Sequence, residues 1–209
     1  MTTYSFASPD SVLNPAIMLF VGDDLALPAA AGRLGPEFPA VFKAACDSEA
    51  FRGKSGAVLD LIAPAGVPAS RVIIYGLGAV AEIGKTDWVT LGGKLMARVP
   101  TGRKLSVLFD LPGAGAESAA DVVLGMGLRG YSFERYKTKK KKDDDANGGP
   151  EAITLHLADH AAAKKALKAR DGLLTGVNMA REIVKETQNV MTPTEFVKSA
   201  GELEKLGGE

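Results

Sequence analysis

Several residue types that mark specialised classes of protein are scarce in this sequence. Cysteine occurs once in 209 residues, at Cys46, which excludes an intramolecular disulfide framework and fits a reducing compartment. Lysine plus arginine and aspartate plus glutamate number 25 each, so no net positive charge draws the whole chain to nucleic acid or to an anionic membrane. Any contact with such a polyanion must therefore be local.

Long hydrophobic runs are also lacking. The longest apolar run, Pro15 to Val21, is far shorter than the roughly 20 residues that cross a bilayer. The first six residues, Met1 to Phe6, have neither the basic start nor the apolar core of a secretory signal. We therefore expect a cytoplasmic protein without a membrane span.

Apolar runs of strand length are present instead, and each is bounded by glycine, proline or aspartate. Several are nearly continuous, which is typical of strands covered on both faces. A further run, Ile153 to Leu157, alternates with period two and predicts an edge strand with one solvated face, on which His156 lies with Thr154. The four earlier runs are Ala16–Val21, Ala57–Ile62, Arg71–Tyr75 and Leu105–Phe109. The pattern predicts an α/β fold with a mixed sheet sandwiched between helices.

Segments with helical spacing separate and follow these strands. The clearest spans Glu117 to Tyr136, and its glycines Gly125, Gly127 and Gly130 each weaken a helix by up to about 1 kcal/mol relative to alanine. We interpret them as sites of close packing against the sheet. The other predicted helices are Pro36–Arg52, Thr86–Arg98 and Ala161–Glu186, the last bent or interrupted at Gly172 and Gly176.

The C-terminal residues carry a helix-start signal. Thr192 is a candidate N-cap, Pro193 occupies the first helical position, and Glu195 completes a capping box. This helix is predicted to run to about Leu206 and to end at Gly207-Gly208. A strand would normally come next, so we expect the chain to be cut there rather than finished.

A charged loop is predicted from Lys137 to Pro150. Lys139 to Lys142 form a basic block and Asp143 to Asp145 an acidic one. The basic block could bind phosphate, but three adjacent aspartates would oppose a polyanion. A solvated loop is the favoured interpretation.

One turn has the form of a phosphate cradle. Gly76 to Ala81 comes directly after the strand Arg71–Tyr75 and fits the G-x-G-x-x-A dinucleotide pattern. However, the acidic residue expected about 20 residues further on is missing near Met96 to Arg98, and Asp110 comes too late. A strand-ending glycine turn is favoured over a nucleotide site.

Other candidates for chemistry are weak. The two histidines, His156 and His160, lack the spaced Cys/His/Asp set of a metal site. Cys46 has no nearby histidine, and no G-x-S-x-G nucleophile motif occurs. The strand-end aspartates Asp23, Asp24 and Asp110 have no partner that would tune their pKa, which favours turn and cap roles. We therefore predict no catalytic, cofactor-binding or metal-binding residue in this chain.

Two motifs, in order, resemble the leucyl aminopeptidase (cytosol aminopeptidase) family. Leu128 to Lys140, which contains G-Y-S-F-E-R-Y-K and then the start of the charged loop, resembles the late N-domain motif of that family. Gly176 to Val184 and Asn189 to Phe196 resemble its linker helix and its entry into the peptidase domain, with one departure at Lys185–Asn189, where members commonly have N-E-P-A-N. Arg71 to Gly78 is also similar to a family strand that ends in G-L-G.

The resemblance implies a macro-domain-like N-terminal α/β domain over residues 1–158, a linker helix over 159–188, and the beginning of a truncated peptidase domain over 189–209. The parent would be a hexameric exopeptidase with two Mn or Zn ions, held by G-K-G-x-T-F-D-S-G-G and N-T-D-A-E-G-R motifs. Neither motif occurs in this sequence. The chain itself would then be a non-catalytic assembly or regulatory portion.

Two other functions remain open at this point. A stand-alone macro-like module could bind a nucleotide or an ADP-ribose-type ligand through the Gly76 to Ala81 turn. Some family members bind DNA, and Lys139 to Lys142 could add local phosphate contacts, although the neutral composition disfavours this. Partners of the chain would otherwise be its own peptidase domain and further copies.

Overall fold

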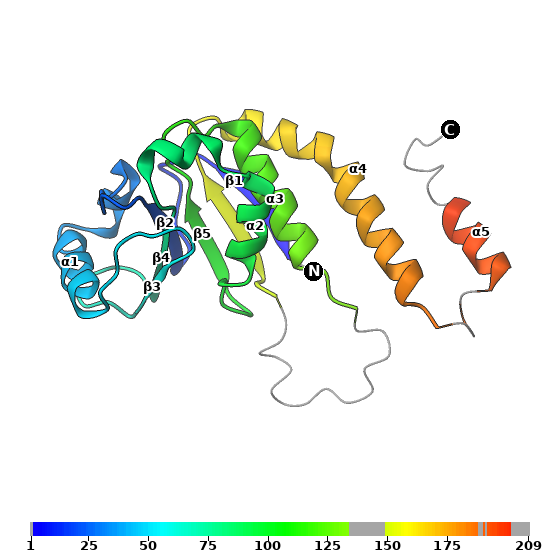
Figure 1. Cartoon of the computed structure of the whole chain (residues 1–209), viewed down its shortest axis with the longest axis horizontal. Helices are drawn as coiled ribbons and strands as arrows, with labels where there is room; N and C mark the ends of the chain where they lie inside the picture. Colours follow the sequence, from blue (N-terminus) through cyan, green and yellow to red (C-terminus); the bar gives the residue numbers. More distant parts are fainter. Residues whose placement is uncertain (1, 134–148, 188–189, 191, 202–209) are drawn as a thin grey trace.

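The computed structural model describes residues 2–133, 149–187, 190 and 192–201. These residues contain six strands, five α-helices and two short 3₁₀ helices (Figure 1). The strands are β1 (Thr3–Ala7), β2 (Ala16–Val21), β3 (Val58–Ile62), β4 (Arg71–Gly76), β5 (Lys104–Leu108) and β6 (Ala152–His156). The helices are η1 (Ala29–Leu34), α1 (Phe38–Ser48), η2 (Val80–Lys85), α2 (Trp88–Met96), α3 (Ala116–Arg129), α4 (His160–Lys185) and α5 (Pro193–Gly201).

The strands form one mixed sheet in the order β1-β6-β5-β2-β4-β3. Every neighbouring pair is parallel except β3 with β4, which is antiparallel. The central strand β2 is buried along its whole length, as its continuous apolar sequence predicts. The mixed sheet between helices is therefore confirmed.

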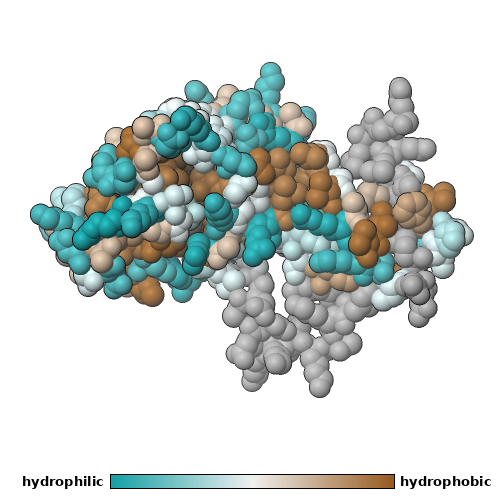
Figure 2. Space-filling view, in the orientation of Figure 1, coloured by the Kyte–Doolittle hydropathy of each residue, from teal (hydrophilic) through white to brown (hydrophobic). Residues whose placement is uncertain are grey.

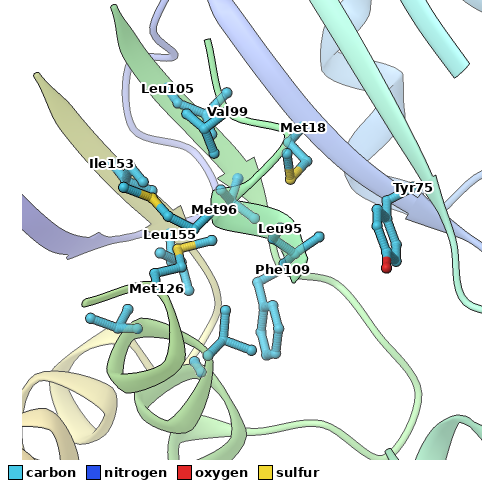
Figure 3. Close-up of a cluster of buried hydrophobic side chains, with 14 of the residues drawn as sticks. Met18, Tyr75, Leu95, Met96, Val99, Leu105, Phe109, Met126, Ile153 and Leu155 are labelled. Atoms are coloured by element: carbon cyan, nitrogen blue, oxygen red, sulfur yellow. The ribbon is translucent and has the colours of Figure 1, made fainter. Parts of the chain in front are cut away.

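One face of the sheet is covered by α2, α3 and the first half of α4. Side chains from β2, β5 and β6 meet side chains from these helices, and Figure 3 shows Met18, Leu105 and Leu155 among them. Phe109 joins this core through an edge-to-face contact with Phe20, their ring centroids 6.2 Å apart. The opposite face packs against η1 and α1, mainly through Phe38, Phe42 and Cys46.

Two helices approach each other at glycines. A Cβ on Gly125 of α3 would lie 1.9 Å from the Val89 carbonyl oxygen of α2, and one on Gly92 would lie 2.0 Å from the Val122 oxygen. Gly127 faces Leu174 of α4 and Gly130 faces Met96. The predicted close packing is therefore confirmed, but its partners are neighbouring helices rather than the sheet.

Strand β6 corrects a prediction. It is not an edge strand, because it pairs with β5 on one side and with β1 on the other. His156 is 3% exposed and does not lie on a solvated face. Thr154 on the same face is half-buried beside the exposed Ser5 of β1, with the two hydroxyl oxygens 3.0 Å apart, so this face is closed at His156 and partly open to solvent at Thr154. The edge strand β1 was not predicted at all.

The helices differ from prediction mainly at their ends. Helix α3 ends at Arg129, where Gly130 comes next, and not at Tyr136, which lies outside the described residues. Helix α4 is continuous from His160 to Lys185, so Gly172 and Gly176 do not interrupt it. Thr192 accepts a hydrogen bond from the Glu195 amide at 3.3 Å, which confirms the predicted cap of α5.

Helix α4 leaves the body of the fold and extends past the end of α3 (Figure 1). Within the described residues, none of the helices combines the length and the apolar character that crossing a membrane requires.

Candidate functional site

The glycine turn after β4 is closed against the rest of the backbone. The amides of Gly76, Leu77 and Gly78 donate hydrogen bonds to the carbonyls of Ala57, Val21 and Gly53 at 2.8, 2.9 and 2.9 Å. A phosphate cradle needs such amides free to point at the ligand. The next element along the chain is the 3₁₀ helix η2 rather than the α-helix of a dinucleotide site.

The glycines of this turn are explained by packing alone. A Cβ on Gly76 would lie 2.4 Å from the Lys54 carbonyl oxygen, and Gly78 has a φ of +83°. Gly76 thus leaves no room for a Cβ, and Gly78 holds a left-handed backbone that glycine adopts at low cost. The structure thus gives no support to a nucleotide site at Gly76 to Ala81.

The other sequence candidates have local structural roles. Asp24 accepts a hydrogen bond from the Ala26 amide at 3.1 Å, and Asp110 accepts one from the Ala30 amide at 3.3 Å. Cys46 is 3% exposed on α1, and burial, followed by the charge of Asp47, raises the pKa of its thiol. His160 lies at the start of α4 beside the Ala158 carbonyl. The basic block Lys139 to Lys142 lies outside the described residues.

A buried polar network around His156 was not predicted. The His156 Nε2 lies 2.9 Å from the Ser106 hydroxyl, and its Nδ1 lies 3.0 Å from the Ser11 hydroxyl and 3.2 Å from the Ser8 carbonyl. Asn14 donates to the Ser106 oxygen from its backbone amide at 2.9 Å and from its side chain at 3.2 Å. The network joins the loop between β1 and β2 to strands β5 and β6.

The donors and acceptors fix the form of the imidazole. The Ser106 oxygen already accepts two hydrogen bonds, so its hydroxyl proton goes to His156 Nε2. Ser11 donates to the Ser8 carbonyl at 2.6 Å and therefore accepts from His156 Nδ1. The imidazole is thus neutral with its proton on Nδ1. Burial lowers the pKa of His156, the hydrogen bond to the Ser8 carbonyl opposes this shift, and the charge of Arg33 adds to it.

This network resembles a serine–histidine pair, but its chemistry is structural. Ser106 is 0% exposed, so no substrate reaches its hydroxyl. Arg33 donates hydrogen bonds to the carbonyls of Pro9 and Ser11, which holds the same loop from the side of η1. The network therefore fastens the loop between β1 and β2 to strands β5 and β6.

A second unpredicted cluster lies where α4 passes the end of α3. Arg181 donates to the Leu128 carbonyl at 2.6 Å, and its guanidinium lies 5.6 Å from the centroid of the Tyr131 ring. The Lys185 ammonium lies 5.0 Å from the same centroid, and the Tyr131 hydroxyl donates to Glu182 at 3.3 Å. We call these five residues, Leu128, Tyr131, Arg181, Glu182 and Lys185, the α3–α4 joint.

The joint brings together two sequence motifs that are about 50 residues apart. Tyr131 belongs to the G-Y-S-F motif after α3, and Arg181 belongs to the motif within α4. A cation over an aromatic face contributes about 0.5–1 kcal/mol at an exposed site, and a charge-assisted hydrogen bond contributes about 1.5–3 kcal/mol. The contacts therefore fix the direction in which α4 leaves the domain.

A second attachment anchors the first half of α4. Arg170 donates to Asp121 at 2.6 Å and to Glu117 at 2.8 Å, both on α3. Gly172 and Gly176 lie between this attachment and the joint. Two fixed points on either side of the glycines hold the helix where its intrinsic stability is lowest.

The side chains that could ligate a metal ion are scattered over the fold. In the part of the chain that the structure describes, no three His, Cys, Asp or Glu side chains gather where they could hold such an ion. These residues therefore do not fit the metal pair that the family resemblance implies, and none is assigned to it.

The sheet, its helical layers and the joint define an α/β domain that continues into a long helix. Residues 18–140 match the family model described as Cytosol aminopeptidase family, N-terminal domain. The chain belongs to the cytosol aminopeptidase family, which confirms the resemblance of its motifs. A probable cytosol aminopeptidase of Rhizobium rhizogenes is 44% identical over 183 residues, which are 86% of this chain and 37% of that protein.

Solved structures share the fold. A tomato leucine aminopeptidase mutant superposes with a TM-score of 0.71 and 18% identity over 99% of this chain and 42% of the other. The bottromycin maturation enzyme BotP in complex with Mn superposes with a TM-score of 0.63 and 16% sequence identity. The match covers 92% of this chain and 36% of that one. The chain thus spans about two fifths of the length of the relatives that it matches.

Proposed function

We propose that this chain is the non-catalytic N-terminal portion of a leucyl aminopeptidase, with an assembly or regulatory role. The parent would be a dinuclear metal exopeptidase that releases N-terminal amino acids from peptides. In this proposal the domain does no chemistry itself. It holds the helix that leads into the peptidase domain in one direction.

The α3–α4 joint is the observation that carries the proposal. It links the end of the family-matched region to the part of α4 that extends beyond the domain. A helix that only connected two independent domains would not need an arginine, a lysine and a tyrosine to fix its direction. The contacts favour a role in positioning the peptidase domain.

The division of the chain comes from the same proposal. Residues 1–158 form the macro-like domain, 159–188 the linker helix, and 189–209 the start of the peptidase domain. The first half of the linker helix is part of the domain core, because Ala163 and Ala166 are buried there. The second half would serve as the connection.

The cofactors and partners of the parent belong to the proposal as well. Two Mn or Zn ions would lie in the peptidase domain, and the manganese named for BotP supports the metal type. The whole protein would form a hexamer in the cytoplasm. DNA binding is not favoured, because the charges of the chain balance.

An activity assay tests the absence of catalysis. The purified chain is incubated with leucyl anilide in the presence of Mn²⁺ and, as a control, with a chelator. A full-length family member serves as the positive control. We expect no turnover above the blank, and metal-dependent turnover by the chain would overturn the proposal.

A chimera tests the positioning role. This chain replaces the matching N-terminal region of the Rhizobium rhizogenes relative, and assembly is monitored by size-exclusion chromatography together with peptidase activity. The double variant Tyr131→Ala, Arg181→Ala should lose assembly or activity, because α4 is no longer held. The variant Lys168→Ala, at an exposed position of the same helix, is the control. Equal behaviour of the two would argue against positioning by the joint.

A further inference from the structure

The loop between β1 and β2, residues 8–14, is attached to the rest of the fold mainly through side chains. Within the part of the chain that the structure describes, its one backbone–backbone hydrogen bond runs inside the loop, from the Ser11 amide to the Ser8 carbonyl at 3.1 Å. Asn14 donates twice to the hydroxyl of Ser106 on β5, at 2.9 and 3.2 Å. The attachment to the sheet therefore depends on a small number of polar side chains.

His156 completes this attachment only in its neutral form. Its Nδ1 donates toward the Ser11 hydroxyl and the Ser8 carbonyl, and its Nε2 accepts from the Ser106 hydroxyl at 2.9 Å. A second ring proton, on Nε2, would point at an oxygen that already accepts two hydrogen bonds from Asn14. The Ser106 hydroxyl would then lose its acceptor at a position that is 0% exposed, which is unfavourable.

The charges around the imidazole do not offset this loss. Among the described residues, Arg33 of η1 is the one side chain whose charge shifts the pKa of His156, and it lowers that pKa. Asp10, in the loop itself, is exposed, and Lys104, at the start of β5, is paired with Glu151 at 3.3 Å. No described carboxylate is therefore placed to stabilise a protonated His156.

The loop can open while both hydrophobic cores stay intact. Of its residues, Leu13 alone packs against a core cluster of the described structure, and it is only partly buried there. Strand β1 is paired with β6 from Thr3 to Ala7, directly before the loop. Segments with few buried apolar contacts and few backbone hydrogen bonds open at a lower free energy than the whole fold. We therefore expect the loop to open before the sheet unfolds.

We propose that protonation of His156 releases the loop between β1 and β2 from β5 and β6, while the rest of the sheet stays folded. The proton comes from the solvent and binds Nε2, which changes from an acceptor to a donor. Asn14 then gives up its two hydrogen bonds to Ser106, and its amide becomes open to solvent. This opening requires neither the peptidase domain nor a metal ion, so it is independent of the proposed function.

Hydrogen exchange of single amides, measured by NMR in the unaltered chain from about pH 7.5 to about pH 5, tests the opening. A dye for apolar surface is unsuitable, because Figure 2 shows hydrophobic surface over the outer part of α4, where Val184 is 82% exposed. Below the ordinary histidine pKa of about 6.5, protection of the Asn14 amide should fall by up to about tenfold per pH unit. The Leu77 amide, which donates to the Val21 carbonyl of β2, should keep its protection. Constant protection of Asn14, or an equal loss at Leu77, would overturn the proposal.

Two histidine variants identify the group that titrates. His156→Gln has no ionisable ring, so protection of the Asn14 amide should no longer depend on pH in this range. His160→Gln is the matched control, because the His160 ring lies beside the Ala158 carbonyl at 3.2 Å and outside the network; this variant should keep the full response. A response that persists in His156→Gln, or that disappears in His160→Gln, contradicts the assignment to His156. The titration of the unaltered chain stands as a test even where a variant does not fold.

Discussion

The two halves of α4 have the same sequence pattern and opposite surroundings. In the first half Ala163 and Ala166 are buried, and Arg170 is held by two carboxylates of α3. In the second half Leu173, Ala180 and Val184, which continue the same spacing of three and four residues, are exposed, and the helix is held from another side by the α3–α4 joint. Periodicity thus identifies the face of a helix that will pack, but it does not identify what packs there.

The largest expected effect comes from comparing a charge placed in the buried half of α4 with a charge placed in its exposed half. Ala163→Asp puts a carboxylate at a position that is 0% exposed, so we expect a loss of about 3 kcal/mol or more in the free energy of unfolding. Ala180→Asp, at an exposed alanine in the second half, should change the free energy of unfolding by about 0.5 kcal/mol or less. Urea unfolding measures both, and similar losses would erase the difference between the halves.

Glycine substitutions sharpen the comparison between packed and open helices. Gly125→Ala would bring a Cβ to 1.9 Å from the Val89 oxygen, so α2 and α3 must move apart at a cost of about 1–3 kcal/mol. Gly172→Ala, where nothing lies within 4 Å, should instead stabilise the chain by up to about 1 kcal/mol. Thermal unfolding should therefore show a lower melting temperature for Gly125→Ala and a higher one for Gly172→Ala. A gain from Gly125→Ala would show that the helices are not in contact there.

Lowering the pH should reduce the free energy of unfolding, because His156 must then take up a proton in its buried network. Its pKa in the folded chain is lowered below that of the unfolded chain, chiefly by burial, so the unfolded state binds the proton more readily. The stability that the neutral His156 contributes is complete above the pKa of an unfolded histidine, about 6.5. It is lost as the pH falls from there through the pKa of the folded state, at up to about 1.4 kcal/mol per pH unit.

The measurement is urea unfolding of the unaltered chain and of His156→Gln between pH 7.5 and pH 5, a range of roughly the width in which histidine titrates. His156→Gln should be less stable at the upper end, and the difference should shrink toward the lower end. A difference that stays constant across the range would mean that His156 is not held in its neutral form.

The smallest expected effect concerns the glycine turn after β4. Titration with ADP-ribose or NAD should give no binding heat, because the amides of Gly76, Leu77 and Gly78 already donate to backbone carbonyls. Gly78→Ala should destabilise the chain through its left-handed backbone without any change in that titration. Saturable heat in the unaltered chain would reopen a ligand role for the turn.

The core strands were predictable because their apolar runs are continuous, and the cap at Thr192 because it depends only on neighbours. Strand β6 was placed wrongly at the edge, since a half-polar face does not exclude a further strand at its side, here β1, and since alternation did not reveal that His156 meets the buried Ser106. The α3–α4 joint was not predictable as a contact. Both of its motifs were recognised, but Tyr131 and Arg181 are 50 residues apart, and only the path of α3 and α4 brings them together.

The direction of α4 is the central claim, and a distance between two spin labels tests it most directly. Lys43→Cys on α1 and Ala180→Cys on α4, both at exposed positions, are labelled in a Cys46→Ala background. We expect one narrow distance distribution, which Tyr131→Ala with Arg181→Ala broadens and Lys168→Ala leaves narrow. A broad distribution in the chain with the intact joint, or a narrow one after the joint is removed, would contradict the claim that the joint holds α4.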